Sequence, residues 1–99
     1  MEVGAVKYLF KIQEKLVPEL ISIAENRYTI LRNIYYNQPI GRRALAEKTN
    51  ISERLVRKEL DFLCGRGLIK VNRSGTVMTD LGSDFLPELD KYMKELKDI

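Results

Sequence analysis

The chain has 99 residues, of which 44% are hydrophobic and 31% charged, a composition typical of one globular domain with a small core. It has no histidine, a single cysteine and no Gly-rich phosphate loop, so an intrachain disulfide is excluded and we expect no enzyme and no metal site. No stretch resembles a signal peptide or approaches the roughly 20 apolar residues that span a bilayer, so we expect a cytoplasmic protein without membrane contact.

Two amphipathic helices are predicted in the first third of the chain. The first is short and places on one face Val6, Phe10, Gln13 and Leu16 (or Val17). The second begins at Pro18, since proline is tolerated in a first helical turn, and runs to about Tyr36. Its apolar positions recur every three or four residues: Leu20, Ile23, Ala24, Tyr28, Ile30, Leu31, Ile34 and Tyr35. Pro39 ends it, because proline disfavours the α region at the preceding residue.

A compact helical unit follows this proline. Residues 41–48 predict a short helix with Leu45 and Ala46 facing inward, and residues 49–51 predict a three-residue turn. Ser52 is a favourable N-cap for the next helix, which should end near Arg66 because Gly65 and Gly67 bracket that position.

The pattern then changes from helix to strand. Residues 68–71 and 76–79 predict two short strands rich in β-branched side chains, and residues 72–75 have the composition of a turn. Thr79 is the predicted N-cap of a final helix from Asp80 to Lys97. Its apolar stripe consists of Leu81, Phe85, Leu89, Met93 (or Tyr92) and Leu96. This stripe either packs on the domain's own N-terminal helices or forms a dimer seam.

This order of elements predicts a fold that is mainly α with a small β-hairpin. We interpret it as a winged helix-turn-helix with extra N- and C-terminal helices, in which residues 1–99 form a single domain. The second helix of such a unit enters the major groove of DNA. Residues 41–73 carry nine basic and four acidic residues, whereas the rest of the chain carries eight basic and ten acidic ones. The positive charge therefore lies where a polyanion-binding surface is expected.

The helix that begins after Ser52 has two contrasting faces. At about 100° per residue, Val56, Leu60 and Leu63 share one side, and the opposite side carries three cations. We predict base contacts by Glu53, Arg54, Arg57 and Lys58. We predict phosphate contacts by Arg42, Arg43 and Ser52, and wing contacts by Lys70, Asn72, Arg73 and Ser74.

Other interpretations of these charges remain open. Each group can be an ordinary solvated surface, and winged helices also serve as protein–protein interaction modules without specific DNA readout. Binding of double-stranded RNA through shape and phosphate contacts is a third possibility. The three cations on the outer face favour DNA over an interaction module.

Several runs resemble a known family. Residues 51–60, ISERLVRKEL, resemble the recognition-helix pattern S-E-x-T-[IV]-R-R-[DE]-L of DeoR-type repressors, with Leu55 in place of threonine and Lys58 in place of arginine. Residues 39–45 and 78–82 extend the resemblance to the SorC/DeoR family, over roughly Lys15 to Leu96.

This resemblance implies the N-terminal DNA-binding domain of a longer bacterial repressor of sugar or glycolytic genes. It implies a double-stranded DNA operator as the partner and homo-oligomerisation in the full-length protein. It implies no cofactor in this domain, because a sugar phosphate effector would bind the missing C-terminal domain.

Overall fold

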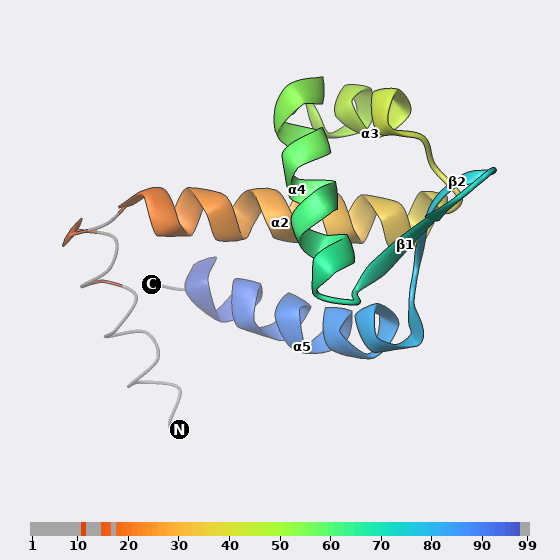
Figure 1. The fold of residues 1–99 in the computed structure, drawn as a ribbon. Coiled ribbons are helices and arrows are strands. Elements are labelled where there is room, and N and C mark those ends of the chain that lie inside the picture. Colours follow the sequence, from red (N-terminus) through yellow and green to blue (C-terminus); the bar gives the residue numbers. More distant parts are fainter. Residues whose placement is uncertain (1–10, 12–14, 17, 98–99) are drawn as a thin grey trace.

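The computed structural model describes residues 11, 15–16 and 18–97. The predicted first helix lies largely outside these residues. The described elements are α2 (Pro18–Asn37), α3 (Arg42–Thr49), α4 (Glu53–Gly65), β1 (Ile69–Asn72), β2 (Gly75–Met78) and α5 (Asp80–Lys97) (Figure 1). The predicted order of helices and strands is therefore confirmed from Pro18 onward, and so is the winged helix-turn-helix arrangement with an additional C-terminal helix.

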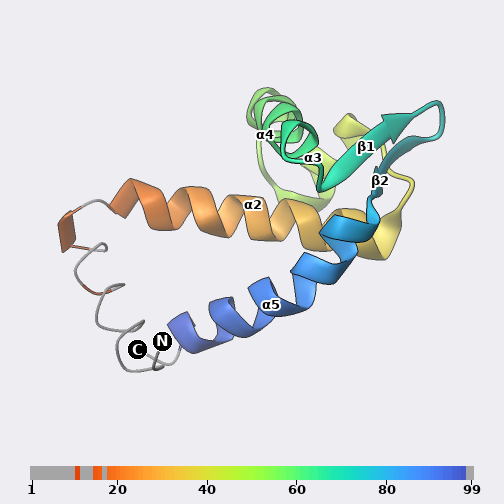
Figure 2. The same cartoon turned by 60° about the horizontal axis from the view of Figure 1, so that its bottom comes forward.

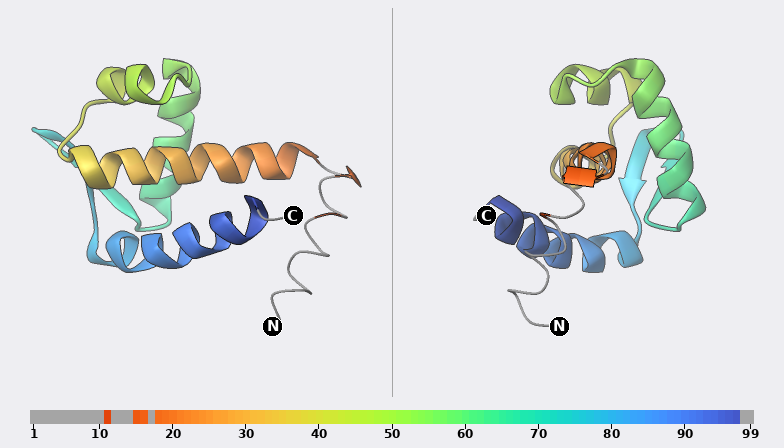
Figure 3. Two further views of the ribbon diagram at one scale, coloured as in Figure 1. Left: turned by 180° about the vertical axis from the view of Figure 1, so that it is seen from behind. Right: turned by 90° about the vertical axis from the view of Figure 1, so that its left-hand side faces the viewer.

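Helix α2 is the central element of the domain. Viewed along its axis, α3 and α5 lie on opposite sides of it, and α4 runs past a third side (Figure 3). The backbone of α2 approaches α3, α5 and β2, whereas α4 approaches α3 and β1. The tip of the β-hairpin projects on the same side of α2 as α3 and α4 (Figures 1 and 2).

The core fills the space between these helices and the hairpin. Ile30, Leu31 and Ile34 of α2 are at most 1% exposed, because apolar residues at this spacing share one face of a helix. Around them are buried Ile40, Leu45, Val56, Leu60, Leu63, Ile69, Met78 and Leu86. Tyr35, which we predicted on the apolar stripe of this helix, is instead 41% exposed, and Ile23 is 39% exposed.

The buried face of α5 differs from the predicted stripe. Met93 is buried and Leu89 packs against the core, as predicted, whereas Leu81 is 58% and Phe85 is 37% exposed and Leu86 is buried in their place. The first half of the stripe was misplaced by about one residue because the start of α5 buries Leu86 instead of Phe85, and only tertiary packing decides this. Packing on its own domain is confirmed for α5, since it contacts α2 directly.

A hydrogen bond between two side chains also joins α5 to α2. The hydroxyl of Tyr28 donates to Asp90 Oδ1 at 2.5 Å. This hydrogen bond, together with burial, raises the pKa of Tyr28 above its ordinary value.

The strands pair antiparallel with Ile69 opposite Met78 and Asn72 opposite Gly75. Each strand lies one residue from its predicted position, because the Asn72 side chain accepts from the Ser74 amide at 2.9 Å and closes a two-residue turn. On the outer side of β2, Ile40 exchanges two backbone hydrogen bonds with Thr76, at 3.1 and 2.8 Å. The hairpin is thereby tied to the segment between α2 and α3.

Thr79 joins the end of α4 to the start of α5. Its hydroxyl accepts from the Gly82 amide at 3.0 Å, as predicted for an N-cap, and donates to the Gly67 carbonyl at 2.6 Å. The Thr79 amide donates to the carbonyl of Leu68. This junction leaves no room at Gly82, where an added Cβ would lie 2.0 Å from the Leu68 oxygen.

We therefore expect Gly82→Ala to lower the free energy of unfolding by about 1–3 kcal/mol, as overpacking against a fixed backbone does. The measurement is urea unfolding followed by circular dichroism. Gly65→Ala is the matched control, because a Cβ there meets nothing within 4 Å. It should be neutral or stabilise α4 by up to about 1 kcal/mol. Equal stability of the two variants would contradict the close approach at Gly82.

Candidate nucleic-acid interface

The turn between α3 and α4 sets the angle of the second helix. Asn50 adopts a left-handed conformation with φ of 58°, which asparagine tolerates better than most side chains. The Thr49 hydroxyl donates to the Leu45 carbonyl at 2.8 Å and accepts from the Ile51 amide at 3.3 Å. Both ends of the turn are thus fixed by local hydrogen bonds, as expected for a three-residue connection of this kind.

Ser52 begins α4 as its N-cap. Its hydroxyl oxygen accepts from the Leu55 amide at 3.2 Å, which satisfies one of the unpaired donors of the first turn. The predicted capping role is therefore confirmed, whereas the phosphate contact of Ser52 stays a prediction.

The outer face of α4 is basic, as the helical count predicted. Val56, Leu60 and Leu63 are buried, and the three cations Arg54, Arg57 and Lys58 are exposed on the other side. Arg54 and Arg57 also line a shallow hollow of about 250 Å³ together with Arg42 and Glu53. Side chains from α3 and α4 therefore converge on one surface.

Glu53 links the two helices at this surface. Its Oε1 lies 3.4 Å from Arg42 Nε, and its Oε2 lies 4.0 Å from Arg43 Nε. Glu53 and Arg42 are each nearly half exposed, so the contact orients side chains more than it stabilises the fold. Sequence reasoning assigned these residues separate roles and missed their pairing.

The four predicted wing residues lie together on the hairpin. Lys70, Asn72, Arg73 and Ser74 are all exposed, with Arg73 and Ser74 in the turn itself. Val71 is also 62% exposed, although its strand neighbour Ile69 is buried. The hairpin therefore presents two exposed cations, Lys70 on β1 and Arg73 in the turn, and one exposed apolar side chain, Val71.

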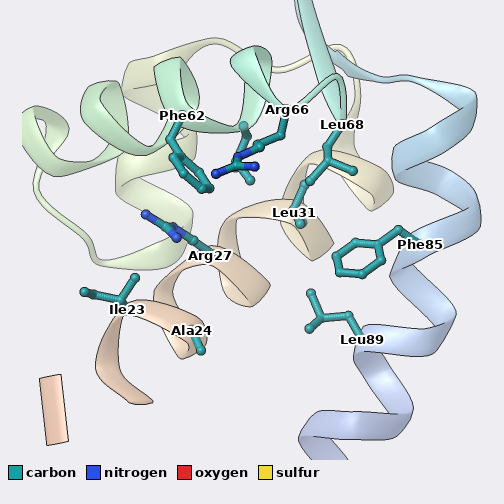
Figure 4. A pocket seen from close by; sticks show the side chains of 10 residues that line it. Ile23, Ala24, Arg27, Leu31, Phe62, Arg66, Leu68, Phe85 and Leu89 are labelled. Atoms are coloured by element: carbon teal, nitrogen blue, oxygen red, sulfur yellow. The ribbon is translucent and has the colours of Figure 1, made fainter. Parts of the chain in front are cut away.

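A second hollow lies on the opposite flank of α4. It has a volume of about 500 Å³ and is bounded by α2, α4 and α5 (Figure 4). Its lining is apolar except for Arg27 and Arg66. Glu59, which the sequence analysis only counted among the charges, is buried beside it and pairs with Arg27.

Within the described part of the chain, no cluster of three or more acidic, cysteine or histidine side chains could hold a metal ion. Across those same residues, no helix is long and apolar enough to cross a membrane.

Comparison with known proteins identifies close relatives of this chain. Residues 23–93 match the family described as CggR N-terminal DNA binding domain. The central glycolytic genes regulator of Priestia megaterium is 43% identical over 91 residues, which are 92% of this chain and 27% of that protein. The regulator of the same name from Bacillus subtilis is 36% identical over 88 residues, or 89% of this chain and 26% of that protein. An uncharacterized protein of Methanocaldococcus jannaschii is 33% identical over 95 residues, 91% of this chain and 24% of its own length.

The chain thus spans about a quarter of the length of the curated relatives it matches. Among solved structures, a protein of unknown function from Listeria innocua superposes with a TM-score of 0.65 at 17% identity. The alignment covers 96% of this chain and 81% of that one, and it shows a shared fold.

Removing the Ser52 hydroxyl tests whether this N-cap stabilises the start of α4. We expect Ser52→Ala to lower the free energy of unfolding by about 1 kcal/mol, because one amide of the first turn loses its acceptor. Chemical denaturation measures this loss. Ser22→Ala on the exposed face of α2 is the control and should cost nothing, since alanine favours a helix interior.

Proposed function

The chain belongs to the CggR N-terminal DNA-binding domain family, and from this membership we propose that it is the operator-binding domain of a transcriptional repressor of glycolytic genes. The observation that carries the proposal is the family match over residues 23–93, in which α4 presents its basic face to solvent. In this function the chain acts by binding and not as an enzyme.

Helix α4 enters the major groove of the operator. Arg54 and Arg57 present planar guanidinium forks, which match the two acceptors on the major-groove edge of guanine. Lys58 adds a point charge on the same face, and the Glu53 carboxylate can accept from the amino group of cytosine. Because all four are exposed in the described structure, they can reach base edges without unfolding of the helix.

Helix α3 places the domain on the phosphate backbone. Arg42 and Arg43 begin this helix, and Gly41 before them makes no side-chain cap hydrogen bond, so the first amides of α3 are available to a phosphate. Glu53 lies within ion-pair distance of both arginines and orients Arg42 in particular. Ser52, which caps α4, adds a hydroxyl donor.

The wing contacts the duplex beside the recognition helix. Lys70 and Arg73 supply charge for phosphate or the minor groove, and Asn72 and Ser74 hold the turn in shape. These contacts add affinity with little dependence on sequence.

The relatives extend well beyond the region aligned with this chain. We assign homo-oligomerisation and the binding of a sugar phosphate effector to the part of the full-length protein that this chain does not cover. One domain contacts one half-site, so linking two copies raises affinity through effective concentration. The domain described here needs no cofactor for this role.

Arg57→Ala tests the recognition face. We expect it to weaken binding to the preferred duplex by about 1–3 kcal/mol while leaving binding to scrambled DNA nearly unchanged, because a base contact is lost. The duplex is selected from a random pool with the unmodified chain, and affinities are measured by fluorescence anisotropy.

Lys94→Ala is the control, since Lys94 is an exposed cation on α5, on the other side of α2. An unchanged preference in the Arg57 variant would contradict base readout by α4. Failure of the unmodified chain to prefer any duplex would favour the interaction module.

Arg73→Ala tests the wing separately. We expect weaker binding to every duplex by a similar factor, with the slope of log K against log salt falling by about one, because one phosphate contact is lost. A salt series on both duplexes measures it. A change confined to the preferred duplex would instead place Arg73 on a base.

A further inference from the structure

Glu59 is a buried carboxylate on a helix whose other charges face solvent. Its side chain is 7% exposed, and Arg27 Nε of α2 donates to its Oε2 at 2.6 Å. The Arg27 side chain is 32% exposed, so the full desolvation cost falls on the carboxylate, and such a pair rarely stabilises a fold more than apolar side chains of similar size would. Its presence between α2 and α4 therefore calls for a geometric explanation.

Arg27 contacts α4 at a second point. The centre of its guanidinium lies 3.6 Å from the ring centroid of Phe62, one turn beyond Glu59 (Figure 4). Arg66 lies 5.1 Å from the same ring centroid. One planar group is thus fixed by a carboxylate on one side and by an aromatic face on the other, which restricts its orientation more than either contact alone.

The two acidic anchors flank the apolar stripe of α4. At about 100° per residue from Val56, Glu59 lies at about −60° and Glu53 at about +60°. Glu59 is tied to α2 and Glu53 to α3. Burial of the stripe sets which face of α4 turns inward. The two ionic contacts add directional restraint at the edges of the stripe, where they oppose small rotations of α4 about its axis.

Small rotations matter at the outer face. A helix with side chains is about 10–12 Å across, so a 20° rotation moves the side chains of its outer face by about 2 Å. A binding site must hold its groups to within about 0.5 Å of the productive geometry. The backbones of α2 and α4 do not form one of the close packing contacts of the domain, so the long side chains span the gap.

We propose that Arg27 and Glu59 are positioning residues for sequence readout, whose ion pair fixes the rotation of α4 and thereby aims Arg54, Arg57 and Lys58 at the base edges. This inference rests on the proposed function. It assigns a role in DNA specificity to one side chain of α2 and one on the inner flank of α4, away from the basic outer face of that helix.

The test separates positioning from stability. The double variant Arg27→Met/Glu59→Met replaces the pair with apolar side chains of similar length, which should keep thermal stability near that of the unmodified chain. We expect its preference for the selected duplex over scrambled DNA to fall at least about tenfold, with the salt dependence unchanged because no phosphate contact is lost. Arg27→Lys keeps the charge and loses the planar fork, so it should lose preference with a smaller structural change.

Tyr28→Phe is the matched control. Tyr28 is next to Arg27 on α2, and this variant removes its hydrogen bond to the Asp90 carboxylate. That hydrogen bond joins α2 to α5 and not to α4. We expect a lower melting temperature and an unchanged preference for the selected duplex.

Full preference in folded Arg27→Lys or in the double variant would overturn the inference and leave the proposed function intact. Loss of preference in Tyr28→Phe would also overturn it, because any weakening of the fold would then suffice. Absence of preference in the unmodified chain would overturn the proposed function, and the inference with it.

Discussion

The burial of Ile30, Leu31 and Ile34 on α2 is the interaction on which the rest of the domain depends. With these side chains inside, α2 offers surfaces to α3, β2 and α5 around its circumference. The apolar stripe of α4 joins the same core, which leaves its cations no position except the solvent side. The exposure of this charged face is thus a consequence of where the apolar residues of α4 lie.

Local signals in the sequence were sufficient for most of the fold. Pro18, Ser52 and Thr79 begin helices, and each acts within a few residues of itself. The exposed position of Arg57 likewise followed from helical periodicity alone. The strand bounds were displaced by one residue because the hydrogen bond from Ser74 to the Asn72 side chain shortens the turn. The buried face of α5 was misplaced only in its first half, because Leu86 becomes internal only once α5 meets α2.

The ion pairs that organise the candidate site join residues far apart in the sequence, so helical periodicity and capping signals do not predict them. Glu53 and Arg42 are 11 residues apart, and Glu59 and Arg27 are 32 apart. An acidic residue within a basic helix suggests a partner, but sequence alone does not say on which element that partner lies. From the sequence, Glu53 was predicted to contact a base, and Glu59 counted only toward the net charge. The structure shows that each carboxylate links α4 to another helix.

The two hydrogen bonds between Ile40 and Thr76 make the hairpin part of the same rigid frame as the helix-turn-helix. Their geometry leaves no room for a side chain at Gly75, whose Cβ would meet the Ile40 backbone at 2.8 Å. The distance from the wing tip to the outer face of α4 is consequently set by backbone pairing. If the domain binds DNA as proposed, the exposed side chains of α4 can be exchanged to suit another operator while the span of the footprint along the duplex is conserved. Under that proposal, sequence preference and footprint length are two separately adjustable properties.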